Sequence, residues 1–226
     1  MRPETQRTIA GLATTVVGTT DDKLAIVFLH GFSMHAGDFA PFAHSLGVSA
    51  QYWFPNGPIV GGLGGQAWWD IDLARRADSL AEGPRDLYLE VPTGRDAARA
   101  AFAQFLDEIA PEVGARPLVI IGFSQGGMLA FDHVLHAPAR PAALALLSSS
   151  RIAWPQWQPR LARVQGLPMF VSHGRTDDDL AFAAGEAIRD AALQGGAAVT
   201  WLPFDGGHGV PMIVWRGLRK FLNALG

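Results

Sequence analysis

Short apolar segments alternate along this chain with longer segments in which apolar residues recur every three or four positions. This alternation is typical of strand-helix-strand units, whose strands lie parallel in one sheet. The predicted strands are 23–30, 50–55, 117–123, 142–148, 168–174 and 198–204. The predicted helices are 38–46, 96–110, 125–136, 180–193 and 211–225. Residues 12–20 are predicted as an additional edge strand, so the expected fold class is α/β, with a mostly parallel central sheet flanked by helices.

Composition and charge predict the number of domains and exclude some classes of partner. The chain has 226 residues, of which 49% are hydrophobic and 17% charged, and this predicts one domain, residues 1–226, with a sizeable core. The formal charge is −3 and the basic residues are scattered, so we expect neither nucleic acid nor an anionic membrane surface as a partner. Apolar runs are too short for a membrane span, and the first residues do not build a signal-peptide core, which favours a cytoplasmic location.

The sequence contains no cysteine. This excludes disulfide bonds, thiolate metal sites and a cysteine nucleophile. No histidine pair has the His-Glu-x-x-His spacing of a zinc helix, so no metal site is predicted. Any nucleophile must therefore come from oxygen or nitrogen.

The motif Gly-x-Ser-x-Gly lies at Gly122, Ser124 and Gly126, between a predicted strand and a predicted helix. At such a junction a sharp turn lifts the serine hydroxyl above the carboxyl edge of the sheet, and the glycines let neighbouring backbone pass closely. The alternative, that Ser124 only caps the helix, does not require glycine at both flanking positions. We interpret Ser124 as a nucleophile.

A serine nucleophile needs a base and an acid that orients the base. Asp177 follows the predicted strand 168–174, and His208 follows the strand 198–204 in a glycine-rich loop. The order serine, acid, histidine is the one expected for this arrangement. Asp178 and Asp179 compete with Asp177, which we favour because it is closest to the end of its strand.

Acyl transfer also requires donors for the oxyanion, usually one backbone N–H after the nucleophile and one after an early strand. These would be the N–H groups of Gln125 and Phe32. The latter residue follows the His-Gly pair at the end of the strand 23–30.

Residues 56–95 break the periodic pattern and are predicted to form an excursion near the active site. The glycines of this segment do not form a dinucleotide-binding fingerprint. Trp68 and Trp69 in this segment, together with Trp154 and Trp157, are candidates to wall a substrate pocket, the alternative being that each fills the core.

The stretches "LHGFS", "GFSQGG", "SHGRTDD" and "GGHGVP" resemble the carboxylesterase and acyl-protein thioesterase (phospholipase/carboxylesterase) family of α/β-hydrolases. The resemblance spans nearly the whole chain and implies a serine esterase with Ser124, Asp177 and His208 as its triad and with no metal or organic cofactor. The implied partner is a small-molecule ester. Two positions depart from the family pattern: Asp178 stands where proline is common, and Gly209 where glutamate is common.

Three functions remain open on the sequence. The first is hydrolysis of short-chain or aryl carboxylic esters through an acyl-enzyme, which we favour. The second is an acyl-protein thioesterase or lysophospholipase, which uses the same triad. The third is a non-catalytic binding module of the same fold, which the presence of all three triad residues disfavours. The sequence does not predict the oligomeric state.

Overall fold

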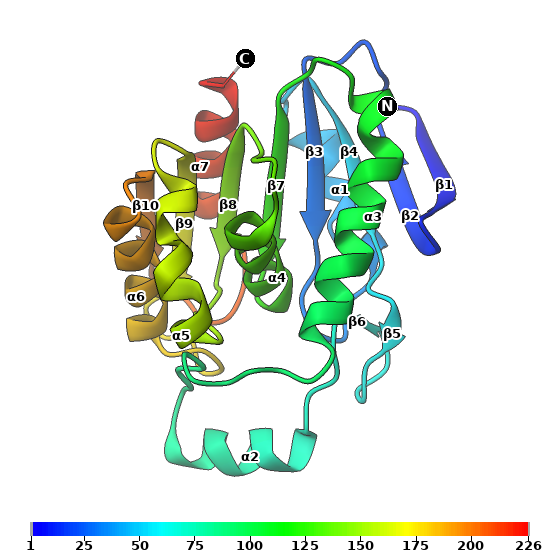
Figure 1. The fold of residues 1–226 in the computed structure, drawn as a ribbon. Coiled ribbons are helices and arrows are strands. Elements are labelled where there is room, and N and C mark those ends of the chain that lie inside the picture. The colour runs from blue at the N-terminus through cyan, green and yellow to red at the C-terminus, as the bar shows by residue number, and fades with distance from the viewer. Residues whose placement is uncertain (1, 226) are drawn as a thin grey trace.

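A computed structural model describes residues 2–225 (Figure 1). Eight strands form one sheet in the order β1-β2-β4-β3-β7-β8-β9-β10. Every neighbouring pair from β4 to β10 is parallel, so the expectation of a mostly parallel sheet is confirmed. The parallel strands are β3 (Leu24–Leu29), β4 (Ala50–Pro55), β7 (Leu118–Phe123), β8 (Ala143–Leu147), β9 (Pro168–Gly174) and β10 (Ala198–Phe204).

One end of the sheet differs from the prediction. The segment β2 (Leu12–Val17) is a strand, but it lies inside the sheet, because β1 (Glu4–Ile9) pairs antiparallel with it and forms the edge. Ala10 and Gly11 connect the two strands with φ angles of 47° and 78°, as a tight two-residue hairpin turn requires. The strand β1 is exposed at all but one residue, so it lacks the apolar pattern that would identify it.

Helices cover both faces of the sheet (Figure 1). Side chains of successive strand residues point to opposite faces, so Val27 packs in one core cluster while Ile26 and Phe28 pack in the other. The first face is covered by α3 (Arg95–Val113), α4 (Gln125–His136), α5 (Trp154–Trp157), the 3₁₀ helix η2 (Gln158–Val164) and α6 (Phe182–Gln194). The second face is covered by the short 3₁₀ helix η1 (Ala36–Asp38), α1 (Ala40–Ser45) and α7 (Met212–Asn223).

The segment 56–95 contains a two-stranded ribbon and a helix that the sequence pattern did not predict. The strands β5 (Ile59–Val60) and β6 (Gln66–Ala67) pair antiparallel, and α2 (Leu73–Glu82) follows them. Figure 1 shows α2 as a separate helix beyond the carboxyl ends of the parallel strands. None of its residues is buried. Throughout residues 2–225, we find no helix with the length and apolarity that crossing a bilayer requires.

Burial of His133 on α4 makes the stability of this fold dependent on pH. The ring packs edge to face against Phe102, and burial lowers the pKa of His133 from 6.5 to about 4. Between these values the unfolded chain binds a proton that the folded protein does not. Lowering the pH through this window should therefore reduce the free energy of unfolding by up to about 1.4 kcal/mol per pH unit for this one histidine.

Urea unfolding of the wild type and of His133→Gln between pH 7 and pH 4.5 measures this contribution. We expect the stability of the variant to depend less steeply on pH. The remaining slope belongs to other groups such as His30, whose pKa burial also lowers to about 4. Equal slopes in the two proteins would contradict the assignment.

Candidate active site

Ser124 occupies a strained turn between β7 and α4. Its φ and ψ angles are 51° and −117°, a conformation that residues other than glycine rarely adopt. A Cβ atom on Gly122 would lie 2.3 Å from the carbonyl oxygen of Gly126, and one on Gly126 would lie 2.3 Å from the carbonyl oxygen of Leu29. Both flanking positions therefore require glycine, because the helix starts directly against the ends of β7 and β3.

The loops after β9 and β10 bring an acid and a histidine to this turn. His208 Nε2 lies 2.9 Å from Ser124 Oγ, and His208 Nδ1 lies 2.7 Å from Asp177 Oδ2. Because a carboxylate only accepts hydrogen bonds, Nδ1 carries the proton of the neutral ring and Nε2 is free to accept the serine proton. The three residues predicted from the sequence are thus hydrogen-bonded in the order that general-base activation of a hydroxyl requires.

The Asp177 carboxylate is held by three hydrogen-bond donors and contacted by a second histidine, His173, whose Nε2 also lies 2.9 Å from the Leu180 carbonyl oxygen. Its Oδ1 accepts the backbone N–H groups of Asp179 at 3.0 Å and Leu180 at 2.8 Å, and Oδ2 lies 3.2 Å from His173 Nε2 in addition to His208. Burial disfavours the charged carboxylate, but the hydrogen bonds from the two histidines outweigh burial and hold the pKa of Asp177 below its usual range. The acid therefore stays ionised and oriented toward His208.

The two competing carboxylates are placed elsewhere. Asp178 is exposed. Asp179 forms ion pairs with Arg85 and, at 3.0 Å, with Arg76 on α2. Although burial opposes it, these arginines hold the pKa of Asp179 below its usual range. Asp179 thus connects α2 to the loop that carries Asp177.

Phe32 and Gln125 are the two residues predicted to supply oxyanion donors from their backbone N–H groups. Both residues line the same cavity as Ser124 and His208. Gln125 is the first residue of α4, and an N–H group at that position has no carbonyl partner within its own helix. Within residues 2–225, the N–H of Phe32 also has no hydrogen-bond partner. Both N–H groups are therefore unpaired among the described residues, and both residues line the cavity that contains Ser124.

The cavity above Ser124 has a volume of about 1270 Å³ and is lined by both apolar and charged side chains. Apolar side chains from both sheet faces line it, among them Met34, Phe39, Phe123, Met128 and Ile152. Charged side chains line the side formed by α2 and the residues after it, among them Arg75, Arg76, Arg85 and Glu90. Within the described residues, no group of three or more histidine, aspartate or glutamate side chains is arranged to hold a metal ion.

Of the four tryptophans predicted to wall the pocket, Trp69 lines the cavity. The structure corrects the prediction for Trp68, Trp154 and Trp157, which do not line it. Trp68 is 1% exposed and its indole points into the core, where it donates to the carbonyl of His30. Trp154 packs beneath the Arg151 guanidinium at 4.9 Å. Periodicity and composition could not separate these roles, because each tryptophan lies in a segment without regular structure in the sequence pattern.

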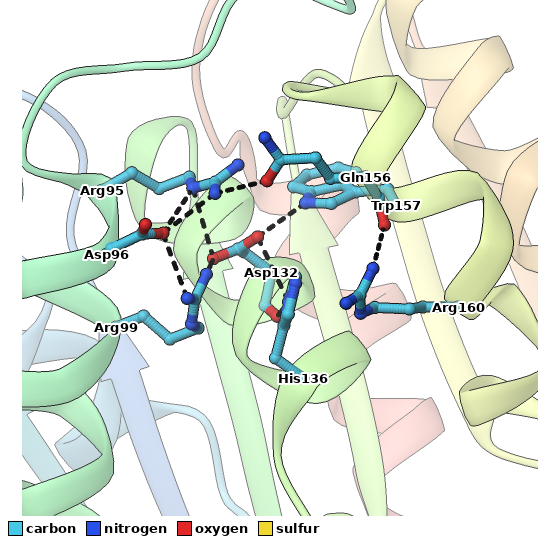
Figure 2. A network of polar contacts seen from close by, with 8 residues as sticks. All are labelled: Arg95, Asp96, Arg99, Asp132, His136, Gln156, Trp157 and Arg160. Atoms are coloured by element: carbon cyan, nitrogen blue, oxygen red, sulfur yellow. Dashed lines mark hydrogen bonds and ion pairs between the residues drawn. The ribbon is translucent and has the colours of Figure 1, made fainter.

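Trp157 belongs to a buried polar network on α4 (Figure 2). Its indole Nε1 donates to Asp132 Oδ1 at 2.7 Å, and Arg99 Nη1 donates to Asp132 Oδ2 at 2.6 Å. Arg95 lies 3.8 Å from the same carboxylate and also donates to Gln156. This network joins α3, α4 and α5, and none of Arg95, Asp132 and Trp157 lines the cavity.

Comparison with known proteins identifies the family of this chain. A profile of the phospholipase/carboxylesterase family matches residues 11–225. The chain belongs to this family. A search of curated proteins gives no match to this sequence.

Solved structures of similar fold include an esterase, a carboxylesterase and an acyl-protein thioesterase. The esterase PE8 has a TM-score of 0.77 at 22% identity, with 100% of this chain and 98% of that chain covered. A carboxylesterase from Mesorhizobium loti has a TM-score of 0.75 at 18% identity, covering 97% and 98%. Acyl-protein thioesterase 2 from Zea mays has a TM-score of 0.74 at 22% identity, covering 94% and 99%. The chain of this phospholipase/carboxylesterase family member therefore has the α/β-hydrolase fold, as expected.

Sequence reasoning missed two features of the site. His173 contacts the carboxylate of Asp177 and is fully buried, and its position before a glycine at the end of a strand does not indicate this contact. Helix α2 contributes Arg75, Arg76 and Ser79 to the cavity lining. The signal for this helix was Asp72, whose side chain accepts the backbone N–H of Arg75 at 3.0 Å as an N-cap.

Proposed function

We propose that this protein is a serine carboxylesterase that hydrolyses short-chain or aryl carboxylic esters through an acyl-enzyme. The observation that carries the proposal is that His208 bridges Ser124 and Asp177, and that Ser124 and His208 line a cavity. In this arrangement Ser124 is the nucleophile, His208 the general base and Asp177 the residue that orients and stabilises the imidazolium.

The reaction proceeds in two halves. Ser124 Oγ attacks the ester carbonyl carbon while His208 Nε2 takes its proton, and the carbonyl oxygen becomes an oxyanion facing the N–H groups of Phe32 and Gln125. The tetrahedral intermediate collapses, the bond to the alcohol oxygen breaks, and His208 donates the proton to that oxygen. Water then attacks the acyl-enzyme with His208 again as base, and the carboxylic acid leaves with Ser124 restored.

The cavity lining supports the substrate class. Near Ser124 the aromatic rings of Phe39, Phe123 and Trp69 favour a compact acyl group or an aromatic alcohol. The charged side chains contributed by α2 and the residues after it are unfavourable surroundings for an extended acyl chain. We therefore expect turnover to fall as the acyl chain lengthens.

One feature favours acyl-protein thioesterase activity as a second candidate. Leu63, Leu89 and Val91 line the cavity yet are 65%, 61% and 56% exposed. An apolar rim of this kind is suited to a larger acylated partner. Thioesters require no change in the triad chemistry.

Hydrolysis of p-nitrophenyl esters with acyl chains from two to sixteen carbons, beside a palmitoylated peptide, separates the two candidates. We expect kcat/KM to be highest at the short esters, and turnover of the peptide to be at least about tenfold lower. A preference for sixteen-carbon chains or for the thioester would contradict the carboxylesterase proposal and favour the second candidate. Absence of turnover on every substrate would contradict both.

A further inference from the structure

The two donors of the proposed oxyanion hole come from loops that are distant in the sequence. Phe32 follows β3, whereas Gln125 begins α4 after β7. An oxyanion hole is effective only when both N–H groups are about 2.7–3.1 Å from one point, so the orientation of one loop relative to the other matters. This inference rests on the proposed function and concerns what sets that orientation.

The side chain of Gln125 binds the tandem tryptophan segment. Its Oε1 accepts the backbone N–H of Trp68 at 3.0 Å, and its Nε2 donates to the carbonyl of Trp69 at 2.8 Å. The side chain is buried, with 2% of the residue exposed. The residue that supplies one oxyanion donor through its backbone therefore holds Trp68 through its side chain.

Trp68 in turn contacts the loop of the other donor. Its indole Nε1 donates to the carbonyl of His30 at 3.0 Å, and the two rings lie 5.4 Å apart between centroids. Because Trp68 is bonded at its backbone to Gln125 and at its indole to His30, it links the two donor loops.

His30 determines the direction of the Phe32 N–H. Its Nδ1 lies 2.7 Å from the carbonyl oxygen of Gly31, and its Nε2 accepts the N–H of Gly57 at 2.9 Å. This pair of bonds requires the neutral ring with the proton on Nδ1. The Gly31 carbonyl and the Phe32 N–H belong to the same trans peptide, in which they point in opposite directions. Because His30 holds the Gly31 carbonyl toward its own ring, the Phe32 N–H points away from that ring.

We propose that Trp68 and His30 are positioning residues of the oxyanion hole, which together with the Gln125 side chain align the Phe32 N–H with the Gln125 N–H. Neither side chain touches the reacting atoms. Trp68 acts by holding the His30 carbonyl, and His30 acts by holding the peptide that contains the donor.

Trp68→Phe tests the link, because it removes the indole N–H and keeps an aromatic ring. Misalignment of a donor weakens binding of the transition state more than binding of the ester. With p-nitrophenyl acetate we expect kcat to fall about tenfold and KM to change less than about twofold. An unchanged kcat in a folded Trp68→Phe protein would overturn the proposal.

Trp53→Phe is the matched control. Trp53 is equally buried in the same core cluster, and its indole nitrogen has no hydrogen-bond partner among the described residues. Its truncation leaves a similar void without removing a hydrogen bond, so we expect wild-type kcat. An equal loss of kcat in both variants would assign the effect to core packing and overturn the positioning role.

Variants of His30 provide an independent readout if Trp68→Phe does not fold. The amide nitrogen of an asparagine side chain can replace Nδ1 as donor to Gly31, whereas leucine cannot. We expect His30→Leu to lower kcat about a hundredfold and His30→Asn to recover about tenfold of that loss. Equal activity of the two variants would overturn the role assigned to His30.

Amide NMR signals separate failure of this inference from failure of the proposed function. If the wild type hydrolyses no ester in a Ser124-dependent manner, the proposed function fails, and the inference is decided by the chemical shifts of the Phe32 and Gln125 amides. We expect these shifts to change in Trp68→Phe and not in Trp53→Phe. Unchanged shifts in Trp68→Phe would overturn the inference whatever the enzyme activity.

Discussion

Replacing Ser124 by alanine is expected to lower kcat/KM for a short p-nitrophenyl ester by about 10⁴- to 10⁶-fold. The Ser124 hydroxyl lies 2.9 Å from His208 Nε2 and is the nucleophile of the proposed chemistry. The variant loses the covalent route and keeps only the oxyanion donors and the binding surface. The loss is measured by following the release of p-nitrophenolate by absorbance, at an enzyme concentration that makes the enzymatic rate much larger than the rate of background hydrolysis.

Ser172→Ala is the control for this experiment. Ser172 is a buried serine on β9 whose hydroxyl has no partner within the described residues, so its removal should leave kcat/KM within about twofold of wild type. If Ser124→Ala kept near wild-type activity, the serine mechanism would be wrong.

The same position links activity to stability. Ser124 holds a positive φ angle of 51° that glycine adopts without strain. We therefore expect Ser124→Gly to be as inactive as Ser124→Ala and to have a free energy of unfolding about 1 kcal/mol higher than wild type in urea titrations. Selection for stability alone would favour glycine at this position. The strain in the turn is therefore attributed to the need for a serine in the site.

Replacing Asp132 by alanine is expected to lower the free energy of unfolding by about 3–5 kcal/mol. The Asp132 carboxylate is fully buried and pairs with Arg99 at 2.6 Å, while Arg95 lies 3.8 Å away with only 4% of its side chain exposed (Figure 2). Removing the carboxylate leaves two guanidinium groups without their buried counter-charge, with only the exposed Asp96 beside them, and the Trp157 indole without its acceptor. A loss of this size is a large part of the 5–15 kcal/mol that is typical of a domain.

Asp96→Ala is the matched control, because Asp96 contacts the same two arginines at 2.9 and 3.1 Å but its side chain is 71% exposed. Ion pairs in water contribute little, so we expect a change below about 1 kcal/mol. Urea unfolding of both variants at neutral pH measures the difference. Similar losses in the two variants, or a loss below about 1 kcal/mol for Asp132→Ala, would show that burial does not make this pair important.

The sequence by itself determined the parallel sheet and the location of the triad candidates. Parallel strands built from apolar runs must bury both faces under helices, and loops after their carboxyl ends must meet at one edge. Ser124, Asp177 and His208 each follow such a strand. Their positions after these strands were therefore enough to predict that they lie near one another. Glycines at 122 and 126 were equally informative, because only glycine allows the backbone contacts made there.

Only the tertiary structure decided the roles of side chains whose environment comes from distant segments. Trp68 and Trp157 have the same side chain as Trp69, yet one donates to His30, one to Asp132, and only Trp69 lines the cavity. The strand β1 and the helix α2 were missed because neither has a buried apolar face: β1 is stabilised by pairing with β2, and α2 by its cap and by ion pairs such as Arg76 with Asp179. A local pattern records which residues avoid water, whereas hydrogen-bond partners across the fold are fixed only when the chain brings those residues together.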